Sequence, residues 1–188
     1  GLGYLGYKSH VTYKMVAENR SMLMDGFQHL TEVTSTNDAL LKISQEVSTN
    51  AICITDNQIS GRGRRGQSWI SNPNDICFSV LRHTELSLEK LSGISLVTGV
   101  AIIEALEHFE IASALQLKWP NDLYFGERKL GGVLIELLGD SEGRQAVAIG
   151  MGLNVAMPAQ AASVLEIRMG MIDRGADVGW LSQYPAES

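Results

Sequence analysis

Short apolar runs alternate along this chain with two segments of helical periodicity, and the alternation limits the folds available to it. Strand-like runs occupy residues 51–55, 76–81, 115–119, 123–125, 129–138 and 146–155. Apolar residues recur at helical spacing over 35–47 and 94–109. The order helix, strand, strand, helix, strand, hairpin, strand predicts an α+β domain, with a mixed or antiparallel β-sheet flanked by helices.

Local signals refine three of these elements. Ser35 and Asp38 fit a capping box, which predicts a helix that begins there and ends near Val47. A broad apolar face is predicted for the second helix, formed by Ile94, Val97, Ala101, Ile102, Ala105, Leu106 and Phe109. The Gly126-Glu127 pair predicts the turn of a β-hairpin.

Composition and charge exclude several classes of protein. A chain of 188 residues with 45% hydrophobic residues can bury one substantial core. Its net charge of −6 disfavours a protein that coats nucleic acid, and no DNA binding is expected. No apolar run approaches the roughly 20 residues of a membrane span, and the start does not resemble a signal peptide. Cys53 and Cys77 lie in apolar runs, so we expect buried thiols in the cytoplasm rather than a disulfide.

The hexapeptide Gly61-Arg62-Gly63-Arg64-Arg65-Gly66 is the most informative segment. Glycines let a backbone approach a ligand, and guanidinium groups offer planar donors to carboxylate and phosphate. Three other interpretations compete. A dinucleotide-binding fingerprint requires a helix directly afterwards, which residues 67–73 do not predict. A nucleic-acid patch and a solvated arginine loop remain open.

A second block places polar side chains at the end of a strand. Pro120 cannot donate to a sheet, so Lys118-Trp119-Pro120-Asn121-Asp122 should end the strand and direct its polar groups outward. Lys129 follows beside Gly131 and Gly132, which suits a cation held next to an anionic oxygen. Alternatively, Lys129 is an exposed hairpin lysine.

Glycines at alternate positions also mark the last predicted strand. Gly150 and Gly152 precede Asn154, and they leave one face of the strand without side chains. A ligand lying close to the backbone would require this arrangement, and a bulge or a tight sheet crossing would give the same pattern.

Together these segments resemble the biotin protein ligase family, over residues 33–155. The matching elements occur in family order: Ser35-Thr36-Asn37; Gln58 with 61–66 and Trp69; 118–122; Lys129-Leu130-Gly131-Gly132 with Glu136; and Gly150, Gly152 and Asn154. The resemblance implies the central catalytic domain of such a ligase, with the fold that biotin ligases share with class II aminoacyl-tRNA synthetases.

The resemblance also implies roles for individual residues. It assigns biotin contacts to Ser35, Thr36, Asn37, Gln58, Gly61, Arg62, Gly63, Arg64, Trp69, Lys129, Gly132 and Gly150. It assigns nucleotide contacts to Arg64, Arg65, Lys118, Asn121, Asp122 and Asn154. Lys129, Arg64 and Asp122 are the implied catalytic residues. No metal ligands are assigned.

The implied reaction has two steps and three small-molecule participants: biotin, ATP and Mg²⁺. Biotin and ATP first form biotinyl-5′-AMP, and a lysine of a biotin carboxyl-carrier protein domain then accepts the biotin. Family members pair through sheet edges, so a homodimer is expected.

Two alternatives to this enzyme remain, an incomplete fragment that binds biotin without turnover and a lipoate-type ligase on the same fold. Residues 1–30 are expected to be an N-terminal segment or linker, in which 1–7 could form a glycine-rich hairpin. Residues 31–188 are expected to be the catalytic domain, shortened at its C-terminus, because only 34 residues follow Asn154. The ligase interpretation requires Gln58 and Lys129 to share one cavity.

Overall fold

The computed structural model describes residues 26–46, 50–73, 75–85, 91, 93–108, 115–139 and 145–155, with the backbone of 177–178. Its centre is a β-sheet whose order across the described residues is β1 (Gly26–Val33), β2 (Ala51–Gln58), β5 (Ile76–Thr84), β9 (Gln145–Leu153), β8 (Arg128–Gly139), β7 (Asp122–Phe125) and β6 (Leu115–Lys118). The short strand β10 (Asp177–Val178) pairs with β8.

The sheet is mixed, as predicted. β1 runs parallel to β2 and β10 runs parallel to β8, whereas the other neighbours pair antiparallel. β1 was not predicted, because its exposed and half-buried positions alternate with few apolar residues. The boundary expected after residue 30 falls inside this strand. The proposed hairpin over 1–7 lies outside the described residues.

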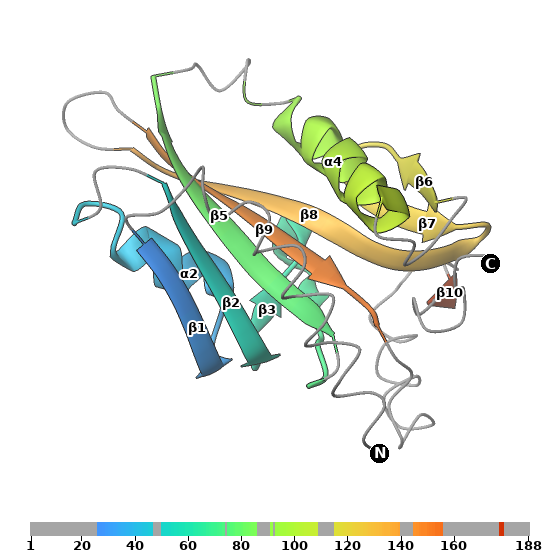
Figure 1. The fold of residues 1–188 in the computed structure, drawn as a ribbon, viewed down its shortest axis with the longest axis horizontal. Helices are drawn as coiled ribbons and strands as arrows, with labels where there is room; N and C mark the ends of the chain where they lie inside the picture. The colour runs from blue at the N-terminus through green and yellow to red at the C-terminus, as the bar shows by residue number, and fades with distance from the viewer. Residues whose placement is uncertain are drawn as a thin grey trace.

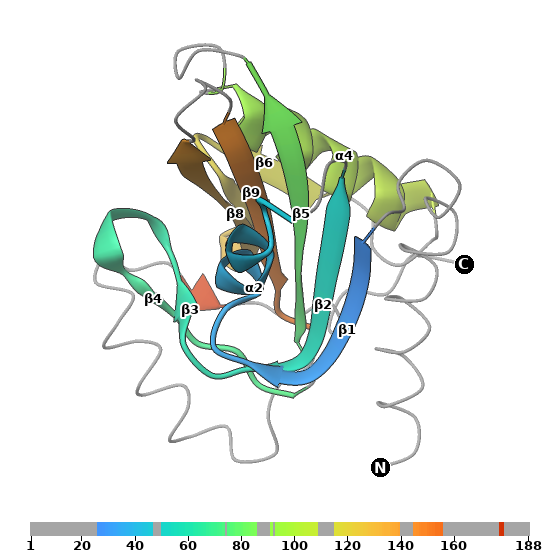
Figure 2. The same cartoon turned by 90° about the vertical axis from the view of Figure 1, so that its left-hand side faces the viewer.

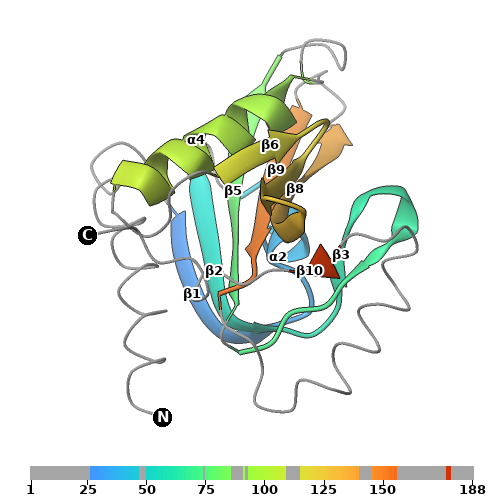
Figure 3. The ribbon, with the colours of Figure 1, turned by 90° about the vertical axis from the view of Figure 1, so that its right-hand side faces the viewer.

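Two layers of other elements cover the sheet on opposite faces (Figures 1, 2 and 3). Helix α4 (Ile94–His108) packs on one face, against β8 and β6. Helix α2 (Thr36–Lys42) packs on the other face, against β2, β5 and β9. A small hairpin of β3 (Gly61–Arg62) and β4 (Ser68–Trp69) stands beside α2, joined by the 3₁₀ turn η1 (Arg64–Gly66). The sequence of residues 56–75, which is polar and rich in glycine, predicts a loop, but the structure shows regular strand pairing within it.

Each layer has its own apolar core. Beneath α4, a cluster joins the helix to the sheet, formed by Ile76, Ile102, Leu106, Leu115, Leu123, Leu130, Val133, Met151, Leu153 and Val155. Beneath α2, a smaller cluster consists of Leu40, Ala51, Cys53, Leu81 and Ala146. Burial of apolar surface in these two clusters is the main stabilising contribution to the domain.

The buried face of α4 is narrower than its sequence predicts. Ile102 and Leu106 are buried, but Val97 is 70% exposed and Ala101 is also exposed. Gly99 faces the sheet, because a Cβ built there would lie 2.5 Å from Leu117 Cδ1. The helix therefore contacts the sheet along a narrow strip. Phe109 lies outside the described residues.

Helix α2 begins where it was predicted, but the predicted capping box is wrong. Ser35 occupies the extended N-cap position and makes no side-chain capping bond, and the Asp38 carboxylate binds Arg62 instead. The helix ends at Lys42, and turns continue to Glu46. Val47, the predicted end, lies outside the described residues.

Both cysteines are buried free thiols, as predicted. Burial raises the pKa of the Cys53 thiol to about 11. No helix in the described part of the chain is long and apolar enough to cross a membrane.

A glycine contact in the sheet gives a first prediction. A Cβ at Gly131 would lie 2.5 Å from the carbonyl oxygen of Gly152, which is backbone and cannot rotate away. We expect Gly131→Ala to lower the free energy of unfolding by about 1–3 kcal/mol, because the central pair β8–β9 must separate. Urea denaturation measures the change.

The control is Gly93→Ala, since a Cβ there meets nothing within 4 Å. This substitution should change stability by less than ~0.5 kcal/mol. Equal effects of the two substitutions would show that the contact between β8 and β9 is not tight.

Candidate active site

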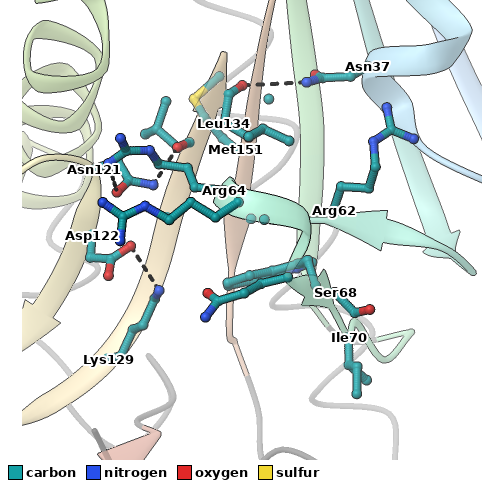
Figure 4. Close-up of a pocket in the computed structure, with 18 of the residues that line it drawn as sticks. Asn37, Arg62, Arg64, Ser68, Ile70, Asn121, Asp122, Lys129, Leu134 and Met151 are labelled. Atoms are coloured by element: carbon teal, nitrogen blue, oxygen red, sulfur yellow. Dashed lines mark hydrogen bonds and ion pairs between the residues drawn. The ribbon is translucent and has the colours of Figure 1, made fainter. Parts of the chain in front are cut away.

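A cavity of about 420 Å³ opens between the sheet and the β3–β4 hairpin, on the face that carries α2 (Figure 4). This volume lies within the range of small-molecule sites, roughly 300–1,000 Å³. Its walls come from the start of α2, the end of β2, the hairpin, the β6–β7 corner and β8 with β9. The lining residues are Ser35, Thr36, Asn37, Gln58, Arg62, Gly63, Arg64, Arg65, Gln67, Ser68, Trp69, Ile70, Lys118, Trp119, Pro120, Asn121, Asp122, Tyr124, Lys129, Gly132, Val133, Leu134, Gly150, Met151, Gly152 and Asn154.

One end of the cavity is built from neutral polar groups. Gln58 Oε1 accepts the backbone N–H of Thr36 at 3.0 Å and lies 3.3 Å from Thr36 Oγ1. The buried Ser79 Oγ lies 2.7 Å from Thr36 Oγ1 and 2.6 Å from Asn37 Oδ1. Asn37 Nδ2 donates to Glu136 Oε2 at 2.8 Å. This end can therefore hydrogen-bond a neutral polar ring.

The alternating glycines of β9 make room for side chains of this protein. A Cβ at Gly150 would lie 2.5 Å from Asn37 Oδ1, and a Cβ at Gly152 would lie 2.5 Å from Trp69 Cε2. Gly150 thus lets α2 approach the sheet, and Gly152 lets the hairpin's indole lie against the strand. The space on this face of the strand is occupied by Asn37 and Trp69.

A single guanidinium ties the hairpin to the rest of the domain. Arg62 binds Asp38 through Nη1 at 2.7 Å and Nη2 at 2.6 Å. The same group binds Glu136, with Nε and Nη2 at 2.9–3.1 Å from the carboxylate oxygens. The hydrogen bonds to Asp38 raise the pKa of Arg62, and those from Arg62 lower the pKa of Asp38. Arg62 therefore joins β3 to α2 and β8.

Arg64 points the opposite way from Arg62 (Figure 4). Its Nη1 lies 3.5 Å from Asn121 Oδ1, across the cavity. Asn121 is fixed, because its Nδ2 donates to the Val133 carbonyl at 2.8 Å. Arg65 has a positive φ of 57° in the turn and is exposed. The hairpin thus places Arg64 over the cavity and Arg65 at its edge.

The second end of the cavity is charged. Lys129 Nζ forms an ion pair with Asp122 Oδ1 at 2.8 Å, and their side chains are 24% and 26% exposed. A Cβ at Gly132 would lie 3.2 Å from Asp122 Oδ1, so the glycine leaves space beside the carboxylate. Arg64 and Lys129 provide positive charge where an anion could bind.

Three further residues complete this end. Lys118 Nζ lies 4.9 Å from the centre of the Tyr124 ring, in a cation–π contact. Burial raises the pKa of Tyr124, and the carboxylates of Asp122 and Glu127 add to the shift. Asn154 is buried, and its Nδ2 donates to the Lys129 carbonyl at 3.4 Å. Asn154 therefore helps to fix the backbone that carries Lys129.

The structure brings nearly all of the predicted site residues into this cavity. Gln58 and Lys129 share it, as the ligase interpretation requires. Gly61 does not line it, and instead packs against Gln58 Nε2 and the Trp69 carbonyl. Ser79 is buried beside this cavity but was not predicted as a site residue, although a serine within the otherwise apolar run 76–81 could have indicated it.

The described residues contain no cluster of three or more His, Cys, Asp or Glu side chains suited to a metal ion. Asp122 is the acidic residue among the described residues that line the cavity, and Lys129 already pairs with it. A metal ion at this site would need most of its ligands from a bound molecule.

Sequence comparison identifies related proteins. The profile of the Biotin/lipoate A/B protein ligase family matches residues 29–154. The bifunctional ligase/repressor BirA of Escherichia coli is 37% identical over 134 residues, covering 71% of this chain and 41% of BirA. A biotin–[acetyl-CoA-carboxylase] ligase of Paracoccus denitrificans is 32% identical over 136 residues, covering 72% of this chain and 57% of that protein.

Solved structures with the same fold include biotin protein ligases. The Leishmania major enzyme in complex with biotinyl-5-AMP superposes with a TM-score of 0.65 at 26% identity, covering 85% of this chain and 64% of that one. The Aquifex aeolicus enzyme in complex with biotin and ATP gives 0.62 at 32% identity, covering 85% and 61%.

The mixed sheet, the flanking helices and the polar cavity define a ligand-binding α+β domain of the fold that biotin ligases share with class II synthetases. The chain belongs to the biotin/lipoate A/B protein ligase family. It spans about two fifths of the length of BirA and somewhat over half of the Paracoccus ligase.

The Asp38–Arg62 pair predicts a pH dependence of stability. Because the hydrogen bonds from Arg62 hold the pKa of Asp38 below its ordinary value of 3.8, the pair stabilises the fold above about pH 4, and this contribution is lost as pH falls through the folded pKa. Asp38→Asn should therefore lower the free energy of unfolding at pH 7, and the difference from the wild type should shrink below pH 4. Denaturation at a series of pH values measures it.

Glu104→Gln provides the matched control, since Glu104 is exposed on α4 at the opposite face. It should leave stability at pH 7 nearly unchanged. A difference for Asp38→Asn that stayed constant from pH 7 to pH 3 would argue against the ion pair as its cause.

Proposed function

We propose that this chain carries the catalytic site of an ATP-dependent biotin protein ligase. The observation that carries the proposal is a single cavity with a neutral polar end at Thr36 and Gln58 and a cationic end at Arg64 and Lys129. Biotin has a neutral ring system at one end and a carboxylate at the other. The relatives named as biotin ligases support the same assignment.

In the first step, a biotin carboxylate oxygen attacks the α-phosphorus of ATP. The bond from that phosphorus to the bridging oxygen of the β-phosphate breaks, which gives biotinyl-5′-AMP and pyrophosphate. Both reactants are anionic, so their approach requires cations. Lys129 and Arg64 supply donors to the carboxylate and to the oxygens of the α-phosphate, where negative charge concentrates.

In the second step, a lysine amine of the acceptor attacks the acyl carbon of the mixed anhydride. The bond from this carbon to the phosphate oxygen breaks, and AMP leaves. The amine must lose a proton, and Asp122 is positioned beside Lys129 to receive or orient it. Trp69 and the hairpin form one wall of the cavity, and this wall would limit hydrolysis of the anhydride by water.

Mg²⁺ belongs to the proposal as the counter-ion of ATP. Asp122 and Asn121 are the cavity residues that could contribute oxygen ligands, and phosphate oxygens would provide the others. When bound, the ion would neutralise phosphate charge.

The acceptor is proposed to be a biotin carboxyl-carrier protein domain, as the names of the relatives suggest. Pairing of two copies through a sheet edge stays a prediction. β1 is the candidate edge, since in the described residues it pairs with β2 alone and it carries the half-exposed Phe27.

The proposal is tested by exchange of labelled pyrophosphate into ATP, which requires a reversible first step. We expect the chain to catalyse this exchange only when biotin is present. Calorimetry with biotin and with lipoate separates the two branches of the family. Binding of lipoate in preference to biotin would overturn the proposal.

Lys129→Ala should reduce formation of biotinyl-5′-AMP by about 100-fold or more, because it removes a cation from the reacting oxygens. The exchange assay measures the rate, and circular dichroism checks that the fold survives. Lys42→Ala is the control, since Lys42 lies at the end of α2 outside the cavity. Normal turnover by Lys129→Ala would remove this residue from the mechanism.

Arg64→Gly tests retention of the intermediate. Arg64 reaches over the cavity to Asn121, so its loss should open the site and release biotinyl-5′-AMP. Released anhydride would label lysines of an unrelated protein such as albumin, detected with streptavidin. Retention of the intermediate by this variant would exclude Arg64 from closure.

A further inference from the structure

Two carboxylates bind Arg62, and one of them, that of Glu136, also binds Asn37. Asp38 binds Arg62 from α2, beside the cavity. Glu136 binds Arg62 from β8 and also accepts the Asn37 amide at 2.8 Å. Its side chain is 25% exposed. Glu136 therefore contacts both the hairpin and the neutral end of the cavity.

The Glu136 contact determines which way the Asn37 amide faces. Nδ2 has two partners, the Glu136 carboxylate and the Leu134 carbonyl at 3.4 Å, and both can only accept. The amide oxygen must then face the opposite side, where Ser79 Oγ lies 2.6 Å away. A flipped amide would place its oxygen against two acceptors, so the negative charge of Glu136 disfavours it.

The orientation of the Asn37 amide determines, through the Ser79 hydroxyl, the direction in which the Thr36 hydroxyl donates. A serine hydroxyl has one hydrogen, and Asn37 Oδ1 takes it because a carbonyl oxygen cannot donate. The Thr36 hydroxyl then has two acceptors beside it, Ser79 Oγ at 2.7 Å and Gln58 Oε1 at 3.3 Å, so it is the donor in both contacts. With its hydrogen engaged, Thr36 Oγ1 has free lone pairs and can accept from a ligand N–H.

We propose that Glu136 is a positioning residue that prepares the neutral end of the cavity to accept N–H groups, while it holds the hairpin through Arg62. The proposal rests on the proposed function and specifies the chemistry of its ring-binding end. A cyclic urea carries such N–H donors. Arg62 acts here as a structural link, since its guanidinium is bound to two protein carboxylates.

Glu136→Gln tests the proposal because it keeps the shape and removes the charge. A glutamine amide can turn either way, so it no longer forces the orientation of Asn37. We expect the Kd for biotin, measured by calorimetry, to rise about tenfold or more. The KM for ATP in pyrophosphate exchange should change less than about twofold.

Asp38→Asn is the matched control, because Asp38 binds Arg62 but not Asn37. If Glu136 acts only by anchoring the hairpin, both variants will raise the Kd for biotin equally, and the proposal is overturned. A much smaller effect of Asp38→Asn supports it. In a double-mutant cycle, Glu136→Gln should have little further effect in an Asn37→Ala background, whereas additive effects would overturn the proposal.

Ser79→Ala decides the question if Glu136→Gln does not fold. This substitution removes the hydroxyl that links Asn37 to Thr36 and leaves the contacts of Arg62 in place. It should raise the Kd for biotin about threefold or more. An unchanged Kd would overturn the proposal. If the wild-type chain neither binds biotin nor exchanges pyrophosphate, the proposed function fails as well. Normal wild-type activity with silent Glu136 and Ser79 variants overturns the positioning role alone.

Discussion

The cavity depends on one guanidinium group. The β3–β4 hairpin stands beside the sheet, and Arg62 fixes it to α2 and β8 through two carboxylates. A planar guanidinium can bind two carboxylates along two of its edges, which an ammonium group cannot do with the same geometry. Because Arg62 is fixed in this way, Arg64, two residues later, is directed across the cavity toward Asn121.

The glycines of β9 connect the fold to the site. A helix and an indole both approach a central strand closely, and only residues without side chains allow this. Asn37 and Trp69 therefore sit at fixed depths against Gly150 and Gly152. The contacts that pack α2 and the hairpin against β9 also form walls of the cavity. Gly150 and Gly152 therefore contact side chains of the protein itself, although their spacing in the sequence suggests a bound ligand.

Much of the sheet could be predicted from sequence because its central strands are buried on both faces. β2, β5 and β9 each contain a largely apolar run, and Gly126, with a φ of 54°, marks the turn between β7 and β8. β1 could not be predicted because it lies at the edge, where polar residues are tolerated. The cavity residues came from glycine and arginine spacing combined with the family resemblance.

The failures have a common physical cause, which is that a local pattern does not show distant partners. Asp38 fits a helix-capping pattern, but its carboxylate binds a guanidinium that lies 24 residues away in the chain. Val97 fits the apolar face of α4, but none of the strands in the described residues buries it, and its side chain is 70% exposed. The occupants of the space beside Gly150 and Gly152 were likewise invisible, because they come from other elements.

The ion pair between Lys129 and Asp122 makes binding of an anion at the cationic end of the cavity less favourable. An incoming anion must exchange places with a carboxylate that is already 2.8 Å from the ammonium group. Chloride or free phosphate would gain little from such an exchange, because its attraction to Lys129 replaces the attraction of similar size between Lys129 and Asp122. Only a molecule that also fills the neutral end brings additional favourable contacts, so selectivity against abundant small anions follows from a contact within the protein itself.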